Sequence, residues 1–143
     1  MTQVDFYFNA PDLMRVAQKL IAKALAAAPT VVVACDEANA AAFDAYLWRF
    51  DAASFVPHAR VGEAAAAHAP VLLLVGAAAS ELPRSHYGLL INIGSAVPAL
   101  AARFTRVLEL VGADETSKVA GRERYAYYKQ RGYPMKAVDL AKK

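Results

Sequence analysis

Three short runs of almost entirely apolar residues constrain the fold of this chain more than any other feature. They cover residues 31–35, 71–75 and 89–93. Each run has the length of a strand, and none shows the regular polar–apolar alternation of a strand with one solvated face. Strands of this kind are typical of parallel sheets, whose two faces are covered by helices. The runs therefore predict an α/β fold with a mainly parallel sheet and helices on both faces.

The segments around these runs complete a β-α-β order. Residues 4–8 form a β-rich alternating run, and residues 104–111 form a later strand-like run. Pro11 opens a helical segment that continues to residue 28. Asp36 is expected to cap a second helix that continues through Trp48. Strands and helices thus alternate along most of the chain.

Length and composition indicate one soluble domain. The 57% hydrophobic content of these 143 residues is far too high for a disordered chain. The N-terminus lacks the basic and apolar regions of a signal peptide, and the longest apolar run, residues 69–79, is too short to span a bilayer. A single cysteine, Cys35, excludes an internal disulfide. We expect a cytoplasmic protein without membrane contact, folded as one domain over residues 1–143, with about 135–143 left open as a flexible tail.

The sequence lacks the patterns that nucleotide, metal or nucleophilic chemistry needs. The turn after the first expected strand, residues 9–12, contains no glycine that would let the backbone approach a pyrophosphate. Gly76 is not followed by the Gly-Lys-Ser/Thr ending of a phosphate loop. The histidines and the cysteine lack metal-ligand spacing, and the adjacent Ser85 and His86 define no catalytic geometry. We therefore expect no enzymatic activity, no cofactor and no bound metal.

The basic character of the chain is confined to its C-terminal end. Residues 114–143 contain eight Lys or Arg against four Asp or Glu, whereas residues 1–113 contain eight against nine. This imbalance indicates one local site for an acidic partner. Four residues of the basic segment fall on one narrow stripe at helical spacing: Lys118, Arg122, Tyr125 and Lys129.

The stripe combines cationic donors with an aromatic ring. Such a surface can hold a carboxylate while an apolar side chain packs against the ring, which suits an acidic peptide tail or a phosphate backbone. Arg124 points well away from the stripe and is expected to matter far less to such a ligand. A solvated helix face is the alternative interpretation.

Three segments of the chain resemble the chi subunit of the bacterial DNA polymerase III holoenzyme. They are Phe6-Tyr7, then the block from Leu47-Trp48 through Asp51 to Ser54-Phe-Val-Pro-His58, and finally Arg122-Glu-Arg-Tyr125 through Tyr128 to Arg131-Gly-Tyr-Pro134. Their order and spacing fit along nearly the whole chain, and the last segment is the most specific. Residues 64–69 and 80–87 contain no motif of this family.

The resemblance implies a Rossmann-like α/β fold without nucleotide chemistry. It also implies a non-catalytic accessory subunit of the clamp-loader assembly. Such a subunit binds the acidic C-terminal tail of single-stranded-DNA-binding protein, which ends in a phenylalanine carboxylate, and so reaches nucleic acid indirectly. The positions that match the tail site are Lys118, Arg122 and Tyr125, with Val111 as its apolar wall.

A second contact implied by the resemblance is with the psi subunit, which ties chi to the clamp loader. The matching positions are Trp48 and Phe55, for which an ordinary core role is the alternative. Two other functions stay open. A direct single-stranded nucleic-acid-binding module would use the same residue types as the tail site, although the positive charge is confined to one helix. A nucleotide-dependent enzyme would suit the scaffold but not the residues.

Overall fold

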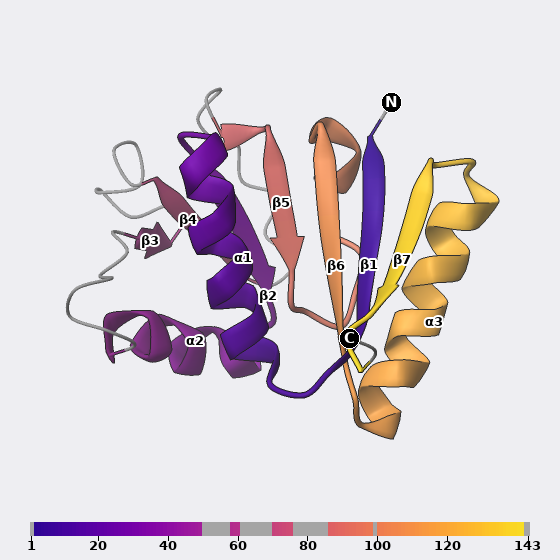
Figure 1. The fold of residues 1–143 in the computed structure, drawn as a ribbon, viewed down its shortest axis with the longest axis horizontal. Coiled ribbons are helices and arrows are strands. Elements are labelled where there is room, and N and C mark those ends of the chain that lie inside the picture. Colours follow the sequence, from indigo (N-terminus) through magenta and orange to yellow (C-terminus); the bar gives the residue numbers. More distant parts are fainter. Residues whose placement is uncertain (1, 50–57, 61–69, 76–85, 99, 142–143) are drawn as a thin grey trace.

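The computed structural model describes residues 2–49, 58–60, 70–75, 86–98 and 100–141. Within these ranges, seven strands form one sheet in the order β3-β4-β2-β5-β6-β1-β7 (Figure 1). All six strand pairs are parallel. The predicted α/β fold with a parallel sheet is confirmed, and it is Rossmann-like.

Most elements lie where the sequence pattern predicts them. The strands are β1 (Gln3–Ala10), β2 (Val31–Cys35), β3 (His58–Arg60), β4 (Val71–Val75), β5 (Leu89–Asn92), β6 (Arg106–Gly112) and β7 (Met135–Asp139). The helices are α1 (Leu13–Ala27), α2 (Glu37–Arg49), the short 3₁₀ helix η4 (Ala101–Arg103) and α3 (Glu115–Gln130). The runs 31–35 and 71–75 form strands with the predicted bounds.

Two core layers cover the two faces of the sheet. All five residues of β2 are buried: Val32 and Ala34 pack in the layer that contains Tyr128 of α3, and the other three pack in the layer that contains Ile21 of α1 and Phe43 of α2. This explains why β2 is apolar at every position. In Figure 1, α1 crosses in front of the sheet, whereas α3 runs along its β7 end. Helices on both faces are therefore confirmed.

Aspartates precede the three α-helices of the described ranges. Asp12 accepts a hydrogen bond from the N–H of Arg15 at the start of α1, and Asp114 accepts one from the N–H of Ser117 at the start of α3. Hydrogen bonds from the hydroxyl and N–H of Ser117 lower the pKa of Asp114. Asp36 directly precedes α2, and its carboxylate accepts from the N–H of Ser95 at 3.1 Å, which ties α2 to the loop after β5.

The flexible tail left open from about residue 135 is not found at residues 135–139. These residues form β7, which pairs with β1, and the N–H of Val4 donates to the carbonyl of Pro134 at 2.9 Å. The side-chain amide of Asn9 also donates to Asp139 at 2.9 Å. The sequence gives little sign of this strand because its three central residues are exposed, so no apolar pattern marks it. Within the described ranges, no helix combines the length and apolar character that crossing a membrane requires.

Candidate peptide-binding groove

A groove with a volume of about 430 Å³ lies between α3 and the strands β1, β6 and β7, and we call it the α3 groove. It contains all four residues that the sequence predicts for a tail site. Among the described residues, nine line it: Phe6, Phe8, Asn9, Val111, Lys118, Gly121, Arg122, Tyr125 and Ala137. Lys129, the fourth residue of the predicted stripe, is exposed and is not among them.

The floor of the α3 groove is apolar. Val111 of β6 and Phe6 of β1 are buried, and the ring of Tyr125 meets the ring of Phe6 edge to face at a centroid distance of 5.2 Å. Tyr125 remains 37% exposed, so one side of its ring packs on the core while part of it is open to a ligand. Aromatic pairs of this geometry stabilise their arrangement, so Tyr125 is held in place before any ligand binds.

Two cations stand on the α3 wall of the groove. Lys118 is half-buried, and the Arg122 side chain is 70% exposed. Arg122 Nη1 lies 3.8 Å from Glu115 Oε1, and both side chains face solvent, so this pair contributes about 0–1 kcal/mol and leaves Arg122 available. None of the nine lining residues is acidic. The groove therefore favours an anion attached to an apolar group.

Gly121 permits the close approach of α3 to β6. A Cβ atom at this position would lie 2.8 Å from both Cγ atoms of Val111, closer than real Cβ contacts. Gly121→Ala is therefore expected to overpack this contact, at about 1–3 kcal/mol, which outweighs the gain of about 1 kcal/mol from better helix propensity. Urea denaturation should show a loss of stability. Val111→Ala makes room for the methyl group, so adding Gly121→Ala to it should not destabilise; an equal loss in both backgrounds would contradict the contact.

The opposite wall of the α3 groove comes from parts of the chain that no sequence pattern marks as a site. Phe8 and Asn9 lie near the end of β1, and Ala137 lies on β7. Asn9 has a φ of 60°, in the left-handed region that Asn adopts more readily than most residues. Its hydrogen bond to Asp139 fixes its amide beside the groove. The left-handed preference of Asn was the one local signal in the sequence for this irregularity of β1.

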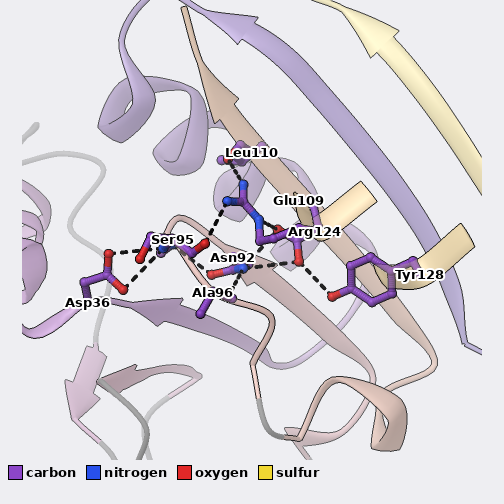
Figure 2. Close-up of polar contacts among 9 residues, drawn as sticks. Asp36, Asn92, Ser95, Ala96, Glu109, Leu110, Arg124 and Tyr128 are labelled. Carbon is purple, nitrogen blue, oxygen red and sulfur yellow. Dashed lines mark hydrogen bonds and ion pairs between the residues drawn. The ribbon is translucent and has the colours of Figure 1, made fainter. Parts of the chain in front are cut away.

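A buried carboxylate lies beneath α3, beside the groove. Glu109 of β6 is fully buried; its Oε1 accepts from Arg124 Nε at 2.8 Å, and its Oε2 accepts from the Tyr128 hydroxyl at 2.7 Å (Figure 2). Asn92 Nδ2 of β5 donates to the same carboxylate at 2.9 Å. Burial raises the pKa of Glu109, although Arg124, Tyr128 and Asn92 act in the opposite direction. Burial and the Glu109 carboxylate raise the pKa of Tyr128.

The guanidinium of Arg124 ties α3 to two further segments. Its Nη1 donates to the carbonyl of Ser95, and its Nη2 donates to the carbonyl of Leu110, each at 3.2 Å (Figure 2). Arg124 is 4% exposed. It does not line the groove, but its buried ion pair with Glu109 gives it a structural role that its place off the stripe did not indicate.

A smaller hollow of about 180 Å³ lies at the carboxyl ends of β2, β5 and β6, where α/β proteins commonly bind nucleotides. It is lined in part by Asp36, Ser95 and Arg124. Its volume is below the range of about 300–1,000 Å³ that holds drug-sized ligands. Within the described ranges, no group of three or more His, Cys, Asp or Glu residues could hold a metal ion.

Comparison with known proteins decides the family. The family model described as "DNA polymerase III chi subunit, HolC" matches residues 1–136. The chain belongs to the DNA polymerase III chi subunit family. The resemblance seen in the sequence is thereby confirmed, and the family is that of an accessory subunit of the polymerase.

Three curated chi subunits are similar to this chi-family chain. The DNA polymerase III subunit chi of Pseudomonas aeruginosa is 36% identical over 140 residues, which cover 94% of each chain. That of Escherichia coli K12 is 35% identical over 104 residues, or 72% of this chain and 69% of the relative. That of Haemophilus influenzae is 30% identical over 114 residues, or 77% and 75%.

The structure does not describe the side chains of the two residues that are expected to contact psi. Trp48 belongs to the last turn of α2, but its side chain lies outside the described residues. Phe55 also lies outside them. The psi contact therefore stays a prediction from the resemblance, whereas the α3 groove has a described geometry.

Proposed function

We propose that this chi-family chain is a non-catalytic subunit of the clamp-loader assembly that binds the acidic C-terminal tail of single-stranded-DNA-binding protein in the α3 groove. The observation that carries the proposal is the convergence of Lys118, Arg122, Tyr125 and Val111 on one groove with a cationic wall and an apolar floor. Such a groove can select a short segment that ends in an aromatic side chain and a carboxylate.

The cationic wall of the groove suits the carboxylates of such a tail, and its apolar floor suits the phenylalanine ring. Arg122 and Lys118 provide N–H donors for the terminal carboxylate and for acidic side chains, and charge-assisted bonds of this kind are about twice as strong as neutral ones. The ring of the terminal phenylalanine would pack on Phe6, Val111 and Tyr125. A groove of about 430 Å³ accommodates one such ring with its carboxylate, in the size range of small ligand sites.

A titration of two labelled ligands tests the proposal. A fluorescent peptide with the tail sequence and a fluorescent single-stranded oligonucleotide are each titrated with this protein, and anisotropy is measured. We expect saturable peptide binding that requires the terminal phenylalanine, weakens with added salt and exceeds binding of the oligonucleotide. Tighter binding of the oligonucleotide would instead favour a direct nucleic-acid-binding module.

We also propose that Trp48 and Phe55 contact the psi subunit. Phe55→Ala is then expected to weaken assembly with psi or the clamp loader in a pull-down while changing the free energy of unfolding little. Phe43→Ala is the matched control, because Phe43 is fully buried on α2 and its truncation should cost about 3–5 kcal/mol. A loss of that size for Phe55→Ala would place Phe55 in the core and contradict the contact.

A further inference from the structure

The buried face of α3 contains few features that fix the helix by shape. Its buried residues are Gly121, Arg124 and Tyr128. Gly121 has no side chain of its own, and Val111 of β6 packs against its bare backbone. The ring of Tyr128 meets the ring of Phe6 at 6.0 Å, and aromatic contacts of this kind tolerate a range of geometries. Directional hydrogen bonds therefore add to this packing in setting the rotation of α3 about its own axis.

Those hydrogen bonds converge on one carboxylate. Glu109 accepts one hydrogen bond from Arg124 at Oε1 and one from Tyr128 at Oε2. These two donors lie four residues apart on α3. Two bonds at different heights along the helix fix both its rotation and its position along the axis. Figure 2 shows the two side chains reaching the carboxylate from α3.

The carboxylate is itself held from the side of the sheet. Asn92 Nδ2 donates to Glu109 and to the carbonyl of Ala96 at 3.0 Å, while Asn92 Oδ1 accepts from the N–H of Gly94 at 2.8 Å. Glu109 thus cannot follow a movement of α3 without loss of its bonds to β5. A buried network whose members are all paired gives rigidity of this kind.

The groove residues of α3 would amplify any rotation. Lys118, Arg122 and Tyr125 lie on the flank of α3 that adjoins its buried face. Side-chain tips lie about 6 Å from a helix axis, so a turn of about 20° moves them by about 2 Å. Hydrogen bonds to a carboxylate tolerate much less displacement than this.

Stability alone does not explain the network. A buried ion pair loses its hydration, and apolar residues of similar volume often stabilise a protein equally well. The hydrogen bonds of Glu109, however, have preferred angles, so they can fix the orientation of α3, whereas apolar contacts have no such angular preference.

We propose that Glu109 is a positioning residue for the α3 groove: by holding Arg124 and Tyr128 it fixes the rotation of α3 and so places Lys118, Arg122 and Tyr125 for the ligand. This inference rests on the proposed tail-binding function. It assigns to a residue outside the groove a role in affinity, exerted through helix placement.

The test replaces the network with apolar residues of similar volume, in the variant Glu109→Leu/Arg124→Met/Tyr128→Phe. Its thermal midpoint should fall by no more than about ten degrees, because the buried charge pair is removed whole and only the N–H that Asn92 donates to Glu109 loses its acceptor. Affinity for the labelled tail peptide should nevertheless fall at least tenfold. In nuclear magnetic resonance spectra, the cross-peaks between the rings of Phe6 and Tyr125 should weaken, since their 5.2 Å separation depends on the rotation of α3.

A stable triple variant with wild-type affinity and unchanged cross-peaks would overturn the proposal. The cross-peaks need no ligand, so they decide the positioning role even if the wild type fails to bind the peptide, which would sink the proposed function alone. If the triple variant does not fold, Tyr128→Phe decides, because it removes only the hydroxyl. A peptide affinity reduced about threefold with weaker Phe6–Tyr125 cross-peaks supports the proposal, and no change in either contradicts it.

Discussion

Arg122→Glu is expected to abolish binding of the tail of single-stranded-DNA-binding protein, and Arg122→Ala to weaken it about ten- to a hundredfold. The physical reason is the loss of charge-assisted hydrogen bonds to the terminal carboxylate, which contribute about 1.5–3 kcal/mol. Arg122 is 70% exposed, and its one described ion pair is a surface contact to Glu115. Neither substitution should therefore unfold α3.

The measurement is fluorescence anisotropy of the tail peptide at two salt concentrations. Arg15→Ala is the matched control, because Arg15 is an exposed helical arginine on α1, across the sheet from the groove. Lys129→Ala tests a cation of α3 that does not line the groove. Equal losses for Arg122, Arg15 and Lys129 would indicate diffuse charge attraction in place of a site, and a direct nucleic-acid interaction would then become the better hypothesis.

The sequence could predict one wall of this groove because that wall is a single helix. The spacing of Lys118, Arg122 and Tyr125 follows from the helical period, which needs no knowledge of the tertiary fold. Phe8 and Ala137 form the other wall, and they meet α3 only because β7 pairs with β1. Strand pairing between segments more than a hundred residues apart leaves no trace in local patterns.

The same distinction applies to the buried network. The strands β2 and β4 were predictable because burial on both faces requires apolar residues throughout. Glu109 breaks the apolar run of β6, and a carboxylate within such a run was a signal that a buried partner exists. The sequence alone does not show which residue is that partner. Arg124 was expected to point away from the stripe, and it does not line the groove, but its burial depends on how close α3 lies to the sheet.

The largest expected loss of stability follows from that burial. Arg124→Ala leaves Glu109 fully buried without its cation, and removal of one partner of a buried ion pair costs about 3–5 kcal/mol. This is a large part of the 5–15 kcal/mol typical of a domain. Urea denaturation at pH 7 measures it, with Glu123→Ala as the control, because Glu123 is the exposed neighbour on α3. A loss below about 1 kcal/mol for Arg124→Ala would show that the pair contributes little to the fold.

The pH dependence of that loss gives a sharper test, because it identifies the charge responsible. Burial raises the pKa of Glu109 above its ordinary value of 4.5, so the folded state binds the Glu109 proton more tightly than the unfolded state does. The contribution of this group to stability is then fully present below pH 4.5 and is lost as the pH rises through the folded pKa. Arg124 lowers that pKa, so Arg124→Ala should raise it further and extend the decline in stability to higher pH.

The loss of stability caused by Arg124→Ala should therefore be smaller at pH 4, where Glu109 is protonated, than at pH 7. An equal loss at both pH values would mean that the packing of Arg124, and not the charge of Glu109, accounts for its contribution.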